Sequence, residues 1–235
     1  MPEILEWPSA ILKPAAIEAN VVAFSRSGGV TLGGLQRVVR TDRGWWSVAY
    51  KGIALDTPAQ RRVWNAIAAH CGGMAGLMAV PVWSFDSAPW PVGTVNGRVL
   101  VPHSDGTSHG DGSLYAQSPI RVTLVDAVAI GATSVKLRIG GGIDELTGVR
   151  FSYEHALYRT GIPTLVDGTD WTVPVSPAIR APIPAGADLE FGLPTCLVRL
   201  ADDRTMDVRL SSGRFDLVDA AFVEAADYWS DLAAA

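Results

Sequence analysis

The sequence predicts a mainly β protein with one packed α-helix and a small all-β domain inserted between the two ends of the chain. Three observations support this fold class. A strand, a capped helix and a second strand follow one another over residues 44–85. Short strand segments then alternate with turns over residues 120–193, and longer strands return after residue 194. Short strands separated by frequent turn residues are typical of small barrels and sandwiches.

Composition limits the class of protein further. With 235 residues, 48% of them hydrophobic and 18% charged, the chain is long enough for one large or two small cores and is not disordered. The net charge of -5, without a Lys/Arg cluster, argues against nucleic acid contact. Residues 1–6 carry acids where a secretory signal carries bases, so we expect no cleaved leader and folding in the cytoplasm where the chain is made. Cys71 and Cys196 are expected to be small buried hydrophobes.

The N-terminal part is predicted to supply an irregular lead-in and then three strands. Residues 1–19 contain two prolines that break any helix, which favours irregular structure. Residues 21–24 and 34–39 have the composition of short strands. Residues 41–44 predict a tight turn that leads into a strand at residues 44–50. Trp46, Val48 and Tyr50 would lie on one face of this strand and Trp45, Ser47 and Ala49 on the other, which suits a largely covered strand.

A helix is predicted over residues 58–71. Thr57 and Gln60 have the spacing of a capping box, and a proline stands at the first helical position. Apolar residues recur at helical spacing, and Gly72 with its glycine neighbour ends the helix. Residues 63–85 contain no Asp, Glu, Lys or Arg, but the polar and helix-breaking residues inside this run favour two soluble elements over a membrane span.

Residues 86–119 are rich in Gly, Pro, Ser and Asp and predict a projecting β-hairpin at about residues 92–118. A long segment without its own core usually has an external role, such as contact with a neighbouring subunit. The predicted subunit-interface residues are the apolar residues of this hairpin: Val95, Val99, Leu100, Val101, Leu114 and Tyr115.

Two further groups of strands complete the prediction. Those of the inserted domain are expected at residues 120–125, 134–139, 149–153, 156–160, 171–175 and 188–191. Those of the last part are expected at residues 196–200, 206–210 and 215–224, followed by a short helix or a frayed tail. The domains are therefore predicted as residues 1–119 with 195–235, and residues 120–194.

Three segments also carry a resemblance to a known family. The first is Gly44-Trp45-Trp46-Ser47-Val48-Ala49-Tyr50 with Arg61-Arg62-Val63-Trp64, Gly72-Gly73 and Val80-Pro81-Val82. The second is Gly131-Ala132-Thr133-Ser134-Val135-Lys136-Leu137-Arg138 with Gly148-Val149-Arg150-Phe151, Leu157-Tyr158-Arg159, Trp171-Thr172-Val173, Ile179-Arg180 and Ala185-Gly186. The third is Pro194-Thr195-Cys196-Leu197-Val198-Arg199-Leu200 with Met206-Asp207 and Phe222-Val223-Glu224. Together they resemble the distal tail protein family of long-tailed, siphovirus-type bacteriophages.

The resemblance implies a structural protein of the virion. Its expected fold is a β-sandwich ring domain with one packed helix and a belt hairpin that clasps the neighbour, with the inserted small β-barrel on the outside. The expected assembly is a homo-oligomeric ring, taken as a hexamer, at the distal end of the tail tube. The implied partners are further copies of the chain, the tail tube protein and the tail hub or fibre protein, and the implied location is the phage tail tip.

Enzymatic and metal-binding motifs are weak by comparison. The one G-x-S-x-G match, Gly106-Thr107-Ser108-His109-Gly110, lies in the predicted hairpin tip and not at the strand-to-helix turn of a nucleophile elbow. The sequence holds no phosphate-binding loop and no His-Glu-x-x-His pair, so no catalytic residue and no cofactor are expected. His103, Asp105, His109 and Asp111 could approach a cation, but a solvated hairpin tip is the favoured interpretation and no metal site is predicted. His155, beside a glutamate, is interpreted as part of a surface pair.

Alternative functions stay open at this stage. Trp171 in the inserted domain is a candidate sugar contact, which would make that domain a carbohydrate-binding module for the host surface. Another β-rich tail tube or hub component has the same general sequence features. A hydrolytic tail enzyme is the least favoured, because paired acids and an activated nucleophile are missing.

Overall fold

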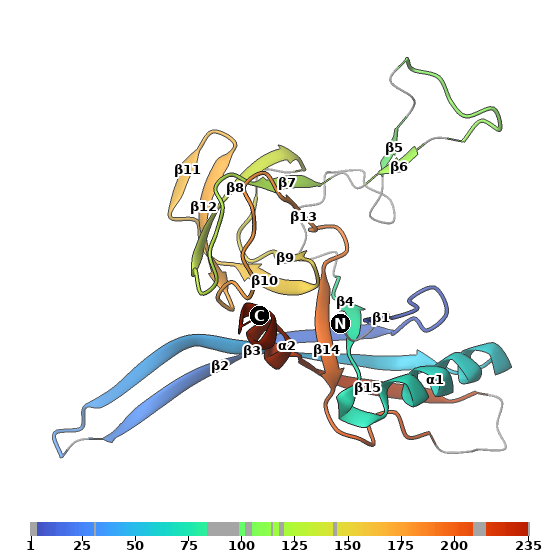
Figure 1. Cartoon of the computed structure of the whole chain (residues 1–235), viewed down its shortest axis with the longest axis horizontal. Coiled ribbons are helices and arrows are strands. Elements are labelled where there is room, and N and C mark those ends of the chain that lie inside the picture. Colours follow the sequence, from blue (N-terminus) through green and yellow to red (C-terminus); the bar gives the residue numbers. More distant parts are fainter. Residues whose placement is uncertain are drawn as a thin grey trace.

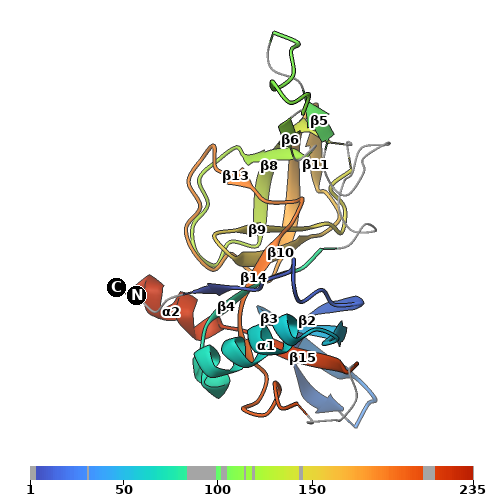
Figure 2. The ribbon, with the colours of Figure 1, turned by 90° about the vertical axis from the view of Figure 1, so that its right-hand side faces the viewer.

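A computed structural model describes residues 4–30, 32–83, 99–101, 105–113, 115–117, 120–142, 145–208 and 215–234. It is mainly β, and its larger sheets form a half-barrel and a nearly closed barrel (Figure 1). The barrel lies on one side of the half-barrel sheet, and the small β5–β6 hairpin extends beyond the barrel, away from that sheet (Figures 1 and 2).

The half-barrel sheet takes its strands from both sides of the inserted barrel. Its order across the sheet is β1 (Leu5–Glu6), β4 (Met78–Pro81), β14 (Thr195–Leu200), β15 (Leu217–Glu224), β3 (Gln36–Ala54) and β2 (Ala16–Val30). Apart from the parallel β1–β4 pair, neighbouring strands are antiparallel. The first and last parts of the chain therefore share one sheet.

Helix α1 (Pro58–Cys71) packs on this sheet, as the sequence predicts. Its N-terminus is closed by the predicted capping box: the Gln60 amide donates to the Thr57 hydroxyl, and the Gln60 side chain accepts from the Thr57 amide. Gly72 ends the helix in the left-handed conformation (φ 55°). The short 3-10 helix η1 (Gly73–Ala75) then leads into β4. The run without Asp, Glu, Lys or Arg that begins at residue 63 is therefore divided among α1, η1 and β4.

The core beneath α1 is aromatic. The rings of Tyr50, Trp64 and Phe222 each meet the ring of Trp7 edge-to-face, with centroids 5.1 to 6.3 Å apart. Edge-to-face contacts of this kind add stability beyond the area they bury. The Trp64 indole also donates to the Met206 carbonyl at 2.9 Å, which ties the helix to the loop after β14.

The inserted part forms the barrel. Its strand order is β13 (Asp188–Leu189), β7 (Arg121–Leu124), β8 (Ser134–Gly141), β12 (Asp170–Ser176), β10 (Ala156–Thr160) and β9 (Arg150–Tyr153), with β11 (Leu165–Asp167) paired to β12. Reciprocal backbone hydrogen bonds of 2.9 Å between Ser152 and Glu190 join the two ends of this order. Inside, the stacked rings of Phe151 and Phe191 lie among buried aliphatic side chains.

Helix α2 (Ala226–Ala234) follows β15 and buries Trp229 against the barrel core. The sequence predicted either a short helix or a frayed tail after residue 224, and the structure has a helix there. Across the described residues, neither α1 nor α2 has the length and apolar character that a membrane crossing requires.

Several strand predictions were wrong. The lead-in is partly regular, because β2 begins at Ala16 and a short β1 precedes it. No turn occurs at residues 41–44: β3 runs from Gln36 to Ala54, and a register shift replaces the turn. Residues 201–206 form turns where a strand was expected to begin at 206, and β11 was not predicted. Turn-forming residues can sit in a bulge as well as in a hairpin, which explains the error at residues 41–44.

Candidate assembly surface

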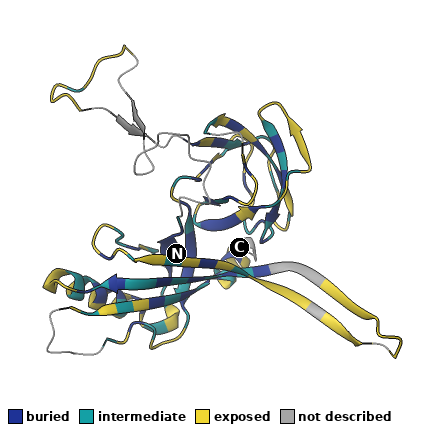
Figure 3. Ribbon diagram, turned by 180° about the vertical axis from the view of Figure 1, so that it is seen from behind, coloured by how far each residue is buried: buried dark blue, intermediate teal, exposed yellow. Residues whose placement is uncertain are grey.

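The outer part of the β2–β3 hairpin projects from the body as a two-stranded ribbon (Figure 1). Strand β15 pairs with β3 only between Ser47 and Ala54, whereas β2 and β3 continue to pair out to Val30 and Gln36. We call residues 22–43 the arm. At about 3.3 Å per residue, strand β2 extends roughly 25–30 Å beyond Val22. The arm and the β5–β6 hairpin project from opposite ends of the molecule (Figures 1 and 3).

The arm exposes large apolar side chains on both of its faces. Most of its described ribbon has the colour of exposed residues in Figure 3. Every side chain that the structure describes between residues 22 and 39 is exposed. Because directly paired residues share a face, the pairing of residue 26 with Val39 puts Phe24 and Val39 on one face and Val38 on the other. These three side chains are 51%, 63% and 58% exposed. Exposed apolar patches commonly mark interaction sites, which makes the arm a candidate interaction surface.

The charge of the arm is opposite to that of the rest of the chain. Residues 22–43 contain four arginines and one aspartate, a net charge of +3. Since the whole chain has a net charge of -5, the remaining residues have -8. Complementary charges of this kind steer association and fix its orientation.

The root of the arm, where it leaves the sheet, is bonded to a buried ion pair. Glu224 on β15 accepts from Arg180 through both carboxylate oxygens, at 2.9 and 3.0 Å, and also accepts from the Trp46 amide at 2.9 Å. The Arg180 guanidinium donates in addition to the Gly44 carbonyl at 2.5 Å. Side-chain exposure is 1% for Glu224 and 15% for Arg180, so this pair is largely shielded from solvent.

Hydrogen bonds at the same junction tie the barrel to both strands of the root. The Trp46 indole donates to the Leu157 carbonyl at 2.7 Å, and the Arg150 guanidinium donates to the Ala19 carbonyl at 3.2 Å. The Tyr158 hydroxyl accepts from the Arg180 amide at 2.9 Å, and burial raises the Tyr158 pKa to about 12. Tyr158 is therefore a neutral hydroxyl at physiological pH.

The predicted subunit-interface residues are only partly described. Strands β5 (Val99–Val101) and β6 (Tyr115–Gln117) pair antiparallel, with Val101 opposite Tyr115. The structure gives the backbone of Val99, Leu100, Val101 and Tyr115, whereas Val95 and Leu114 lie outside the described residues. Contact of this hairpin with a neighbour stays a prediction.

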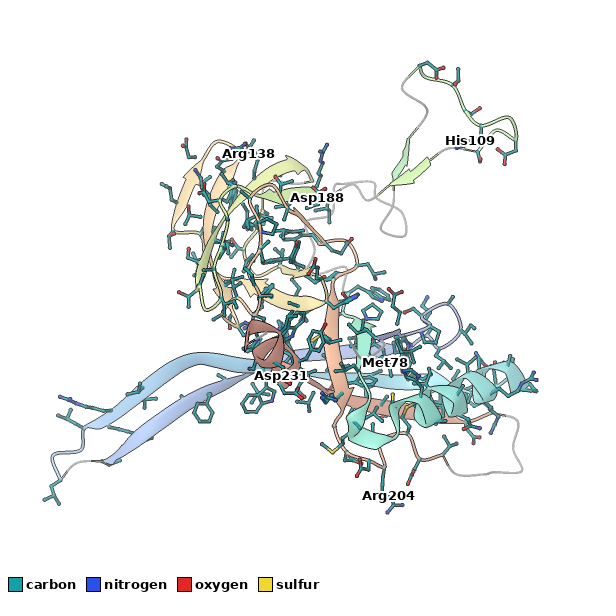
Figure 4. All side chains as sticks on the ribbon, in the orientation of Figure 1. Met78, His109, Arg138, Asp188, Arg204 and Asp231 are labelled. Carbon is teal, nitrogen blue, oxygen red and sulfur yellow. The ribbon has the colours of Figure 1, made fainter. Side chains whose placement is uncertain are left out.

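The tip of this hairpin carries two local turns rather than a cluster of converging ligands. Asp105 accepts from the amide and hydroxyl of Thr107 at 3.0 and 2.7 Å, and Asp111 does the same with Ser113 at 2.9 and 2.6 Å. These hydrogen bonds lower the pKa of both carboxyls. His109 lies at the outer end (Figure 4), and His103 is outside the described residues. Among the residues that are described, no group of three or more His, Cys, Asp or Glu could hold a metal ion.

Trp171 is not available to a sugar. It lies on β12 in the barrel core and is only 9% exposed. A stacking platform needs an exposed ring face, so the proposed sugar contact at this residue was wrong. The alternation along β12 explains its place, since Trp171, Val173 and Val175 all point inward.

His155 lies where the barrel contacts strand β14 of the half-barrel sheet. Glu154 and His155 form the two-residue turn between β9 and β10, with φ of 47° and 69°. The His155 ring lies 2.9 Å from the Thr195 hydroxyl through Nδ1, and its carbonyl accepts from the Leu197 amide at 2.8 Å. These contacts hold the turn against β14. The sequence predicted that His155 forms a surface pair with the adjacent glutamate. In the structure the His155 ring is instead partly buried and contacts Thr195 of the half-barrel sheet.

Sequence reasoning missed the length of the arm and the Arg180–Glu224 pair. The Gly33-Gly34 pair between two strand-like segments was a usable hairpin signal. The ion pair had no such signal, because its residues are 44 positions apart, with Glu224 on β15 and Arg180 in the connection between β12 and β13.

A search of known protein families finds no model that matches this chain. A search of curated proteins finds no match either. The fold and the arm define a β-rich protein with an exposed, apolar and basic ribbon.

Proposed function

We propose that the protein is a non-enzymatic structural component of a phage virion. In this proposal its copies form a ring, a hexamer, at the distal end of the tail tube and join the tube to the tip hub or fibre. The single observation that carries the assembly role is the arm, whose apolar side chains are exposed on both faces. The tail-tip assignment comes from the sequence resemblance, and the half-barrel, packed helix and outer barrel are in keeping with it.

A partner on the arm is expected to stabilise it. A two-stranded ribbon without further strands is marginal in water, because it buries too little apolar surface. A second copy of the chain supplies both an apolar contact and the opposite charge, since the rest of the chain has a net charge of -8. An arm at one end that contacts a different surface of the next copy is a heterologous contact, and such contacts close into rings when the rotation permits.

The two apolar residues that share one face of the arm provide the test. In the double substitution Phe24→Ser with Val39→Ser, each interface loses two large apolar side chains. At about 1–2 kcal/mol each, association should weaken roughly 30- to 700-fold per interface. Sedimentation velocity across a concentration series measures this loss. The matched control is Ile162→Ser with Val166→Ser, which removes similarly exposed apolar side chains from the barrel.

We expect a ring-sized species for the wild-type chain and the control, and monomer for the arm variant with an unchanged circular dichroism spectrum. A wild-type chain that stays monomeric at every concentration would contradict self-assembly. The tail role is tested separately by reconstruction of purified tail tips, where absence of this chain would exclude it.

A further inference from the structure

The barrel contacts the arm at its root, and it does so through separate segments. Arg150 is on β9, Leu157 is on β10, and Arg180 is in the connection between β12 and β13. Their hydrogen-bond partners are the carbonyl of Ala19 on β2 and the backbone or indole groups of residues 44 and 46 on β3. The barrel thus holds both strands at the point where the arm leaves the sheet.

This point is also where the ribbon changes register. Between the pairs Val22↔Trp45 and Phe24↔Thr41, β3 has three intervening residues where β2 has one. Extra residues of this kind bend a strand pair and increase its local twist. Gly44 lies within the extra segment, and a Cβ there would be 2.9 Å from the Val22 carbonyl oxygen. The irregularity thus lies where the arm leaves the sheet.

Arg180 bonds the irregular segment to the rest of the molecule. One guanidinium reaches the Gly44 carbonyl on β3 and the Glu224 carboxylate on β15, and the same carboxylate accepts from Trp46. A planar guanidinium fixes direction as well as distance, because its donors have a rigid geometry. A change in the position of the barrel would therefore be passed to the bend.

We propose that Arg180 is a positioning residue for the arm, and that the barrel through Arg180 sets the direction in which the arm leaves the sheet. If copies of the chain form a ring, as in the proposed function on which this inference rests, the barrel controls the orientation in which the arm contacts the next copy. The barrel then orients the assembly element in addition to forming an outer domain.

The test is a distance measurement on the full chain. Spin labels at Ser25→Cys on the arm and Ala127→Cys on the barrel report the arm direction by double electron–electron resonance, with labelled chain diluted into unlabelled chain. Both positions are exposed, and the two native cysteines are buried. The perturbing variant is Arg180→Met with Glu224→Gln, which removes the ion pair without leaving one charge buried alone.

We expect one narrow distance distribution for the parent and a broadened or shifted one for the variant. Backbone amides at the root, residues 16–22 and 44–47, should exchange hydrogen about tenfold faster or more, because the lost bonds involve charged groups. The control is Arg138→Met with Asp170→Asn, which removes a bidentate ion pair between two strands of the barrel, β8 and β12, that are not among the segments bonded to the arm root as described (Figure 4 labels Arg138). It should change neither readout.

An unchanged distribution and unchanged exchange in the Arg180 and Glu224 variant would overturn the inference. If that variant does not fold, Arg180→Lys carries the same test, since lysine keeps the charge but lacks the fork that bonds Glu224 and Gly44 together. Neither the distance measurement nor hydrogen exchange requires the chain to assemble into a ring. A wild-type chain that never assembles would refute the proposed function, while the arm-to-barrel distance would still decide this inference.

Discussion

At the scale of single residues, the Glu224 carboxylate is where three parts of the chain meet. It accepts from Arg180 of the barrel and from the Trp46 amide at the arm root, and it lies on β15 of the half-barrel sheet. Replacing such a pair by apolar residues is often neutral, whereas removing one partner costs about 3–5 kcal/mol, because an uncompensated charge stays buried. The pair therefore contributes to orientation more than to stability.

Gly44 gives a prediction at the same scale. In Gly44→Ala the new methyl group would be 2.9 Å from the Val22 carbonyl oxygen and 3.0 Å from Val21 Cγ1. Since a backbone atom cannot move aside cheaply, we expect a loss of about 1–3 kcal/mol in the free energy of unfolding. Urea denaturation followed by tryptophan fluorescence measures it.

The control for this prediction is Gly28→Ala on the same hairpin. There the nearest atom to the added Cβ is the Arg37 carbonyl oxygen at 3.5 Å, an ordinary contact. The free energy of unfolding should then be unchanged or rise by up to about 1 kcal/mol. Equal losses in the two variants would show that close approach at Gly44 is not the cause.

At the scale of elements, α1 was predictable and the arm was not. The capping box, the proline and the terminal glycine are local signals, and each acts within a few residues of itself. The bend in β3 depends on contacts with Val22, Glu224 and Arg180, which lie far away in sequence. Local composition at residues 41–44 therefore indicated a turn where tertiary contacts produce a continuous, irregular strand.

The helix cap supplies a prediction for this scale. In Thr57→Ala the Gln60 amide loses its side-chain acceptor, and the free energy of unfolding should fall by about 1 kcal/mol. Thermal and urea denaturation measure the change. Thr57→Ser, which keeps the hydroxyl, should lose much less, and a serine variant as unstable as the alanine variant would argue against the cap.

At the scale of the whole molecule, the half-barrel and the barrel share their cores. Leu197 of β14 belongs to the barrel core, and Leu157 of β10 belongs to the core beneath α1. Trp229 of α2 also packs into the barrel core. The two parts of the chain should therefore unfold together.

We accordingly predict a single cooperative transition in differential scanning calorimetry, with equal calorimetric and van't Hoff enthalpies. The shared residues are the reason, because neither core is complete without the other. Two resolved transitions would show instead that the barrel is an independent unit. The sequence alone indicated an inserted domain but not this interlocking, since inward-pointing residues at the ends of strands do not reveal which core they enter.

The strand order of the half-barrel sheet also has a consequence for synthesis on the ribosome. Strands β4 and β3 pair with β14 and β15, which are translated more than 100 residues later. The N-terminal third cannot complete its sheet until nearly the whole polypeptide has emerged, and pairing across such sequence separation is slow. We therefore expect this sheet to be completed only after the barrel segment has been synthesised, with the edges of β3 and β4 unpaired by β15 and β14 until then.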